Sequence, residues 1–294
     1  MLKNKNTNRA VIAVARFNYD WSDTRLQRFI KEGRGQGEGK EYKPWLQVND
    51  ISSKGRVTRL HGNKADRMHH FLSDMEKKVF YLYEFEPVVV DIREHYPLLD
   101  LLETPEILDS KMKKRLIDNK TSLPHILTTT FLIKLQENGQ TTFIARSVKL
   151  SKELEKNSVI ELYEIQRRYW SEVKKIDYGI ITEKEIPEVR CKNLEWLHSA
   201  YDLQKWNLEM AEVQTYCQLL IDTIRNSSDS LRSVIDAFDQ ELHLEVGTGL
   251  LLFKHLIARH KLIVDLNKEI NFNMSTSCIQ VVSEIEGGSI APNC

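Results

Sequence analysis

The pattern of hydrophobic residues changes near residue 183, and this change constrains the fold more than any other feature of the sequence. Before it, short runs rich in β-branched residues alternate with amphipathic segments, which predicts an α/β domain with a mixed sheet flanked by helices. The expected strands are VVVDIREHY (88–96), HILTTTFLIKL (125–135), TTFIARSVKL (141–150) and DYGIIT (177–182), with a long helix from Ser151 to Lys174. After it, the pattern is almost wholly helical. We therefore predict two domains, residues 1–184 and residues 185–294.

The second domain is predicted to end in a small β element. Its last helical segment is followed by the strand-like runs LIVDL (262–266) and EINFN (269–273). Helices followed by a short β element are typical of helix-turn-helix and winged-helix modules. We expect a winged-helix-like domain, although its acidic middle does not favour DNA binding.

Composition and cysteine spacing exclude several classes of protein. With 41% hydrophobic and 29% charged residues, the chain of 294 residues has enough apolar side chains for folded cores. No apolar run reaches the roughly 18–20 residues that cross a bilayer, so no membrane partner is expected. The four cysteines include no CxxC pair, which argues against a zinc site and a disulfide framework. Because its start shows no signal-peptide pattern, the chain is expected in the cytoplasm.

The formal net charge of zero conceals a gradient along the chain. Residues 1–80 contain 17 Lys and Arg against 9 Asp and Glu, whereas the remaining residues contain 25 against 33. A basic front favours a polyanionic ligand, and an acidic rear favours a different partner. Ordinary scatter of charges is the alternative.

A glycine-rich segment, KEGRGQGEGKEYKPW (31–45), is predicted to form a loop, because its four glycines disfavour a helix or a packed strand. Basic residues punctuate this loop and the extended stretch after it, so that backbone N–H groups and cations could face phosphates together. The predicted DNA contacts are Lys31, Arg34, Lys40, Lys43, Arg56 and Arg59. The segment is not a Walker loop, since no GK[ST] ends it. A solvated flexible loop is the alternative.

A helix is predicted to begin near Leu72, where Ser73 and Glu76 fit a capping box. Capping alone would explain Glu76. The preceding His69 and His70 are adjacent rather than spaced i, i+4 as metal-binding histidines on a helix are. We expect them to have a structural role or to contact phosphate.

Several longer blocks resemble one protein family. We find a close resemblance to the TnsA family, the endonuclease subunits of heteromeric bacterial transposases, in KEGRGQGEGKEYKPWL, HHFLSDMEKKVF, VVVDIREHYPLL, RRYW, ITEKEI and NLEWL. The resemblance spans residues 31–200 and implies a restriction-endonuclease-like domain followed by a winged-helix-like domain. It implies a subunit that binds transposon-end DNA and cuts its 5′ side with the help of Mg²⁺. The implied partners are an integrase-like transposase subunit and an ATPase regulator that contacts the C-terminal domain.

The resemblance also assigns catalytic positions, and three of them carry unexpected residues. Phosphodiester hydrolysis in such a fold uses acids that hold Mg²⁺ and a lysine that acts on the attacking water. The family's helix Glu matches Glu76, the implied metal ligand, and its Lys matches Lys149. The central-strand Asp is replaced by Thr130 and the Gln two residues before the Lys by Ser147. An acid expected in the later helix is replaced by Gln166.

No nearby acid restores the missing charge. The run LTTTFLIKL contains none, Glu137 lies about 23 Å further along an extended strand, and Asp109 and Asp118 lie in an insertion at residues 100–124. Losing about 4 kcal/mol of transition-state stabilisation would slow cleavage roughly a thousandfold. We therefore predict a nuclease fold whose cutting is abolished or weakened and which is retained for DNA contact and assembly.

Two other functions stay open from the sequence. One is an active 5′-end endonuclease with an atypical metal cage, and the other is a DNA-binding regulator that uses the C-terminal helices. Lys149 itself is compatible with a catalytic role, a phosphate contact or a solvated position.

Overall fold

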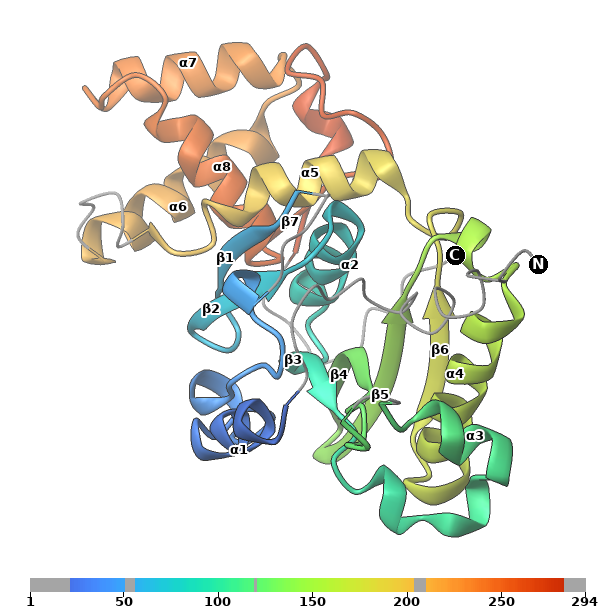
Figure 1. Cartoon of the computed structure of the whole chain (residues 1–294). Coiled ribbons are helices and arrows are strands. Elements are labelled where there is room, and N and C mark those ends of the chain that lie inside the picture. The colour runs from blue at the N-terminus through green and yellow to red at the C-terminus, as the bar shows by residue number, and fades with distance from the viewer. Residues whose placement is uncertain (1–21, 51–55, 119–120, 204–209, 283–294) are drawn as a thin grey trace. The chain divides into compact units, whose positions relative to one another are not determined.

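The computed structural model describes residues 22–50, 56–118, 121–203 and 210–282 (Figure 1). The chain divides into two compact units, residues 1–187 and 188–294. The division predicted between residues 184 and 185 falls just before this boundary. The first 21 residues, which contribute to the basic front of the sequence, lie outside the described ranges.

The first unit is built on a four-stranded sheet in the order β3-β4-β5-β6. Its strands are β3 (Val89–Pro97), β4 (Thr128–Glu137), β5 (Gln140–Val148) and β6 (Asp177–Ile181). The first three pair antiparallel, whereas β5 and β6 pair parallel, which confirms the predicted mixed sheet. Asn138 and Gly139, with φ of 50° and 77°, form the tight turn of the β4–β5 hairpin.

Helices and a separate hairpin surround this sheet. The helices are α1 (Asp23–Lys31), α2 (Asp74–Phe85), α3 (Ser110–Arg115) and α4 (Asn157–Arg167), and the hairpin consists of β1 (Thr58–Gly62) and β2 (Arg67–Phe71). Short 3₁₀ turns occupy Gly39–Glu41, Val48–Asp50, Leu101–Glu103, Pro105–Ile107 and Ser151–Glu153. After Lys31, which ends α1, the glycine-rich segment is thus a loop with one short turn. The described residues of the charged insertion form short helices and one isolated β-bridge.

The single long helix predicted from Ser151 to Lys174 is wrong at both ends. A 3₁₀ turn precedes α4, and a π-helical segment, Arg168–Val173, follows it. In that segment the Lys174 N–H bonds the Tyr169 carbonyl, five residues back, at 3.0 Å. The consecutive aromatics Tyr169 and Trp170 are both buried, and a wider turn brings neighbouring residues onto one side of the helix. A 3.6-residue period cannot predict that local widening.

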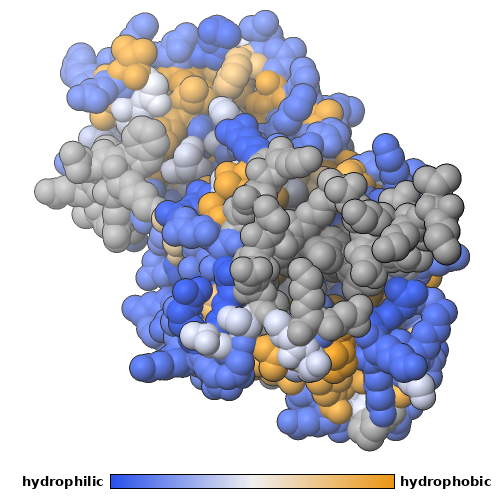
Figure 2. Space-filling view, in the orientation of Figure 1, coloured by the Kyte–Doolittle hydropathy of each residue, from blue (hydrophilic) through white to orange (hydrophobic). Residues whose placement is uncertain are grey.

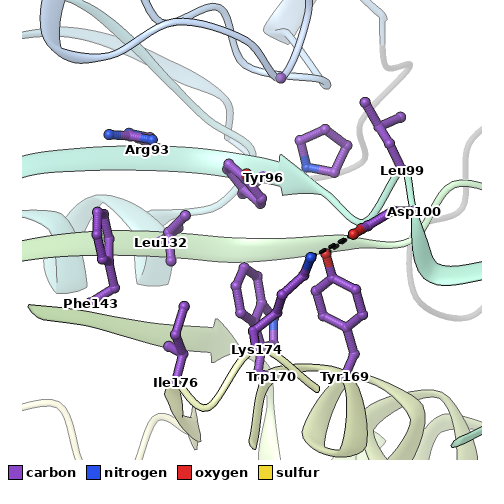
Figure 3. A pocket seen from close by; sticks show the side chains of 12 residues that line it. Arg93, Tyr96, Leu99, Asp100, Leu132, Phe143, Tyr169, Trp170, Lys174 and Ile176 are labelled. Atoms are coloured by element: carbon purple, nitrogen blue, oxygen red, sulfur yellow. Dashed lines mark hydrogen bonds and ion pairs between the residues drawn. The ribbon is translucent and has the colours of Figure 1, made fainter. Parts of the chain in front are cut away.

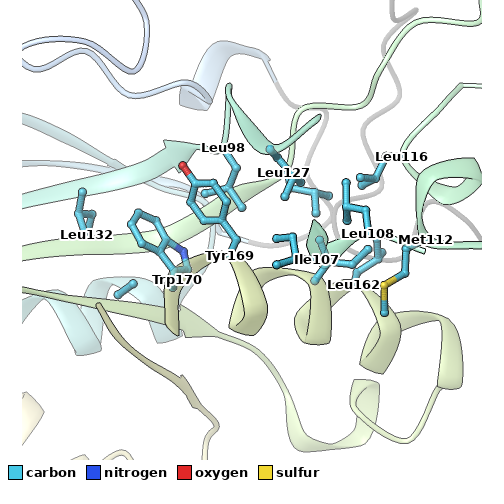
Figure 4. Close-up of a cluster of buried hydrophobic side chains, with 13 residues drawn as sticks. Leu98, Ile107, Leu108, Met112, Leu116, Leu127, Leu132, Leu162, Tyr169 and Trp170 are labelled. Atoms are coloured by element: carbon cyan, nitrogen blue, oxygen red, sulfur yellow. The ribbon is translucent and has the colours of Figure 1, made fainter. Parts of the chain in front are cut away.

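Hydrophobic cores lie on both faces of the sheet. On one face, residues of α3, α4 and the insertion pack on β4 and β5; this cluster includes Met112, Leu132, Ala145, Leu162 and Trp170 (Figure 4). On the other face, Phe131 of β4 contacts Phe71 of β2, which in turn contacts Phe80 of α2. The two cores fix α2 and α4 on opposite sides of β4.

The second unit contains four main helices and one small antiparallel strand pair. They are α5 (Glu188–His198), α6 (Met210–Asn226), α7 (Leu231–Glu241) and α8 (Thr248–Ala258), with β7 (Leu262–Ile263) paired to β8 (Gln280–Val281). Helix α8 packs against the other three. The predicted strand EINFN is wrong: Asn271 accepts the Asn273 N–H and forms a turn there. The predicted strand LIVDL is shorter than expected, and Asp265, which accepts the Asn267 N–H, forms a turn after β7.

The surface view agrees with the composition. Among the coloured residues in Figure 2, hydrophilic ones predominate and hydrophobic ones form separate patches. Among the described residues, no helix has both the length and the apolar character needed to span a bilayer.

Candidate active site

Glu76 is placed by the first turn of α2. The Ser73 hydroxyl accepts the Glu76 N–H at 3.2 Å, so Ser73 is the N-cap, as predicted. The Glu76 carboxylate accepts the N–H of Leu72 at 2.7 Å, one residue before the cap. The sequence motif therefore fixes the helix start and, through it, the position of the acid.

The surroundings of Glu76 are partly apolar and partly cationic. Its side chain is only 13% exposed, and His95 Nε2 lies 3.6 Å from its carboxylate. Burial raises the pKa of Glu76, while the charges of His95 and Lys149 and the Leu72 N–H oppose this shift. His95 lies in β3 with a φ of 49°, a backbone region that is strained for a histidine. The strand is thus distorted where it meets the acid.

Lys149 follows β5 and is paired with an acid that the sequence analysis missed. Its Nζ lies 2.6 Å from the carboxylate of Glu153, which belongs to the 3₁₀ turn after the strand. Burial raises the pKa of Tyr163, and the negative charges of Glu153 and Glu76 add to that effect. Both carboxylates are therefore within electrostatic reach of one hydroxyl. The i, i+4 spacing of Lys149 and Glu153 was the only signal in the sequence.

Thr130 lies at an irregularity of β4. Thr129 bonds residues of α4, Phe131 contacts the α2 side, and Leu132 belongs again to the core under α4. The alternation of faces is thus broken between Thr129 and Leu132. The Thr130 hydroxyl accepts the Val148 N–H at 3.0 Å. The hydroxyl oxygen is thus the acceptor for this N–H, a role that a backbone carbonyl has in a regular β4–β5 ladder.

Ser147 and Gln166 are joined in a buried network of neutral groups. The Gln166 side-chain carbonyl accepts the hydroxyls of Thr129 at 2.9 Å and of Ser147 at 3.2 Å. Tyr178 donates to the Ser147 hydroxyl at 3.0 Å, and the Trp170 N–H donates to Thr129 at 2.7 Å. Gln166 has no exposed surface, and its Nε2 has no partner in the described structure. Two of the three substituted positions are thereby bonded directly to one another.

These residues do not form the cage that Mg²⁺ prefers. A hard cation needs carboxylate or carbonyl oxygens that are free to coordinate it. Thr130 and Ser147 offer neutral hydroxyls that are engaged in other hydrogen bonds, and Glu76 is the one carboxylate among the family positions. Within the described ranges, no group of three or more His, Cys, Asp or Glu side chains is arranged to hold a metal ion.

The predicted DNA contacts in and after the glycine-rich loop divide into two groups. Arg34 is buried: its guanidinium is paired with Asp50, donates to the Trp45 carbonyl at 3.0 Å and lies 3.7 Å from the centre of the Phe29 ring. It holds the loop together and is not presented to a phosphate, contrary to the prediction. The remaining cations are exposed; they are Lys31, Lys40, Lys43, Arg56 and Arg59.

His69 and His70 have the structural role that was one of the two expectations. His69 is fully buried, and its Nδ1 lies 2.9 Å from the carboxylate of Glu94, which also pairs with Arg67. The charges of His69 and Arg67 hold the pKa of Glu94 well below its ordinary value, although burial acts in the opposite direction. The His70 Nδ1 accepts the Val48 N–H at 3.2 Å. This buried cluster ties the β1–β2 hairpin to β3.

A pocket of about 360 Å³ lies elsewhere on the first unit (Figure 3). Asp100 accepts hydrogen bonds from Tyr169 and Lys174 at its rim, each at 2.5 Å. Burial would raise the pKa of Asp100, but these two bonds hold it below its ordinary value. Neither Glu76 nor Lys149 lines the pocket, so it is separate from the predicted site.

Comparison with known proteins identifies the family. The family model described as "TnsA-like endonuclease N terminal" matches residues 86–183, and "TnsA endonuclease C terminal" matches residues 185–266. The chain is 34% identical over 275 residues to "Transposon Tn7 transposition protein TnsA" from Escherichia coli, covering 93% of this chain and 97% of that protein. The chain belongs to the TnsA family.

The three substituted positions and Lys149 lie inside the matched N-terminal family domain. Thr130, Ser147, Lys149 and Gln166 lie within residues 86–183, whereas Glu76 precedes the matched range. The C-terminal TnsA domain begins at residue 185, three residues before α5. The catalytic role of each position in this TnsA chain stays a prediction from the resemblance.

Proposed function

We propose that this TnsA-family chain is a subunit of a heteromeric DNA transposase whose nuclease unit holds transposon ends but cuts their 5′ side poorly or not at all. The observation that carries the proposal is the neutral network at the family's catalytic positions. The Ser147 hydroxyl donates to the Gln166 side-chain carbonyl, and the Thr130 hydroxyl is bonded to the sheet backbone. A site with one carboxylate and two hydroxyls stabilises a divalent cation far less than two carboxylates do.

DNA contact and assembly are the retained functions in this proposal. The exposed cations Lys31, Lys40, Lys43, Arg56 and Arg59 would neutralise phosphates of the transposon end. The restriction-endonuclease-like assignment of the first unit is supported by its mixed sheet with helices on both faces. The winged-helix-like assignment of the second is supported by helices followed by the β7–β8 pair. The partners would be an integrase-like subunit and an ATPase regulator that contacts the second unit.

The products of transposition test this proposal. With its partner subunits supplied, a non-cutting chain should leave 3′ nicks and cointegrate-type products, whereas an active one should release the element by double-strand breaks. The double substitution Thr130→Asp and Ser147→Gln tests whether the residues at these two positions are the cause of the lost cutting. The aspartate keeps an acceptor for the Val148 N–H, but a glutamine at the 1%-exposed Ser147 must displace Gln166 or Tyr178. Double-strand excision by the unaltered chain would contradict the proposal.

A second candidate function, an active endonuclease with an atypical cage, is favoured by Glu153. This acid lies beside Lys149, and both it and Glu76 act on Tyr163. If Glu153 replaces the missing aspartate as a metal ligand, Glu153→Gln should weaken Mn²⁺ binding at least tenfold in calorimetric titration. Exposed Glu155→Gln is the matched control. Under the proposal of a degenerate site, neither substitution changes the binding of Mn²⁺.

A further inference from the structure

The second unit carries three cations that are stacked on aromatic rings. Lys254 Nζ lies 4.6 Å from the centre of the Trp196 ring, and Arg259 Cζ lies 4.1 Å from that of Tyr201. The third pair is Arg232 on Phe272, at 6.0 Å. We call this surface the cation–aromatic row; its members are Trp196, Tyr201, Arg232, Lys254, Arg259 and Phe272.

Direct contacts join two of the three pairs. The Phe272 and Trp196 rings meet edge to face, with 6.1 Å between their centres, and the Arg232 N–H bonds the Phe272 carbonyl at 2.8 Å. Lys254, which lies on the Trp196 ring, also donates to the Ser199 hydroxyl at 3.2 Å. The third pair, Arg259 on Tyr201, lies at the C-cap of the helix that carries Lys254.

The charge of this surface is opposite to that of the unit around it. Residues 188–294 contain 9 Lys and Arg against 15 Asp and Glu. The stretch 246–264, which includes α8, contains no acidic residue but holds Lys254, Arg259 and Lys261. The unit is thus acidic overall, but three of its nine Lys and Arg residues lie in a stretch that contains no acid.

In the part of the chain that the structure describes, the cations of the row lack the carboxylate partners that other surface cations have. Arg225 pairs with Asp222 and Lys268 with Asp265, at 3.0 and 3.1 Å. Within the described ranges, Arg232, Lys254 and Arg259 form no ion pair with a carboxylate. One acid, Asp202, acts electrostatically on His255, a neighbour of Lys254. Burial lowers the pKa of His255, the charge of Arg259 lowers it further, and the charge of Asp202 opposes this shift. Three stacked cations without counter-charges favour an external anionic ligand.

We propose that the cation–aromatic row binds the phosphate backbone of DNA, in addition to the cations predicted for this role in the first unit. Stacking holds each cation in a defined position while leaving its N–H groups free to donate. Lys254 lies on α8 and Arg259 is the C-cap that ends this helix, five positions further along the chain. Because the phosphates of one DNA strand follow one another about every 3.4 Å along the duplex axis, two cations held on separate rings have separate phosphates to contact.

Salt-dependent DNA binding by the full chain tests this proposal. Binding of a fluorescein-labelled 30-base-pair duplex is measured by anisotropy over a series of NaCl concentrations, with EDTA present so that the outcome is independent of any cutting. Lys254→Gln combined with Arg259→Gln removes two phosphate contacts. The slope of log K against log salt should become shallower by about 1.8, because each contact contributes about 0.9.

Arg225→Gln combined with Lys268→Gln is the matched control, since it removes the same charge from two paired, exposed cations of the same unit. It should leave the slope within about 0.3 of that of the unaltered chain. Circular dichroism checks that both double variants fold. An unchanged slope in the Lys254/Arg259 variant overturns the proposal. So does a loss of binding to the transposase partners without a change in slope, which would assign the row to an acidic protein.

Discussion

At the scale of single residues, the buried acid Glu76 makes stability depend on pH. Because its pKa is raised in the folded protein, the folded chain binds a proton more tightly than the unfolded chain there. The contribution of Glu76 to stability is therefore greatest at low pH. It is lost as the pH rises from the ordinary pKa of glutamate, which holds in the unfolded chain, through the raised pKa of the folded chain.

Glu76→Gln should consequently unfold at a urea concentration equal to or higher than that of the unaltered chain above pH 6. The glutamine carbonyl can still accept the Leu72 N–H, so the helix start is preserved. Urea unfolding at pH 5 and pH 8 measures the effect, and the stabilisation should be larger at pH 8. Glu137→Gln, at an exposed position, is the control. A clear loss of stability at pH 8 in Glu76→Gln would mean that the buried charge is well compensated.

Also at the scale of single residues, substitution of Arg34 tests whether this cation has a structural role or contacts DNA. Its side chain and that of Asp50 are 7% and 8% exposed, so truncating Arg34 leaves a buried carboxylate unpaired. Arg34→Ala should lower the free energy of unfolding by about 3–5 kcal/mol. Lys40→Ala, in the same loop but exposed, should change it by less than about 0.5 kcal/mol. Chemical denaturation of the two variants decides the matter. If the two variants were equally stable, Arg34 would not be structural, and it would again be a predicted phosphate contact.

At the scale of elements, the start of α2 connects local sequence to the site. Ser73 caps the helix whose first turn carries Glu76, and Ser230 caps α7 in the same way, at 3.2 Å from the Ser233 N–H. Ser73→Ala and Ser230→Ala should each cost about 1 kcal/mol in thermal or urea unfolding. Only Ser73→Ala should also alter the pH dependence of stability described for Glu76. If Ser73→Ala left both stability and its pH dependence unchanged, the cap would not be what positions the acid.

Hydrophobic periodicity and capping residues were sufficient to predict the strands of the four-stranded sheet, the start of α2 and the helical character of the second unit, but not the β1–β2 hairpin. These signals did not predict the local backbone conformation at positions that make tertiary contacts. The π-helical segment at Tyr169 and Trp170 and the irregularity of β4 near Thr130 each involve a bond to another element: the Trp170 N–H bonds Thr129, and the Thr130 hydroxyl accepts the Val148 N–H. Arg34 was misassigned because charge alone does not show burial, and Glu153 was missed because its partner depends on the turn after β5.

At the scale of the whole molecule, the chain is a TnsA-family protein whose scaffold and predicted catalytic site are considered separately. The mixed sheet, the buried Glu94 cluster and the cap of α2 are intact. At the positions that the family resemblance assigns to catalysis, Ser147 and Gln166 are hydrogen-bonded to each other and Thr130 accepts the Val148 N–H. In the proposed function, such a chain still assembles on DNA while the partner subunit alone cuts.

The most direct measurement is strand-specific nicking of a labelled transposon end by the chain together with its transposase partners, in Mg²⁺ and in Mn²⁺. We predict cuts on the 3′ side only, unchanged when Glu76 is replaced by Ala. Efficient 5′-side nicking that disappears in Glu76→Ala would contradict the account.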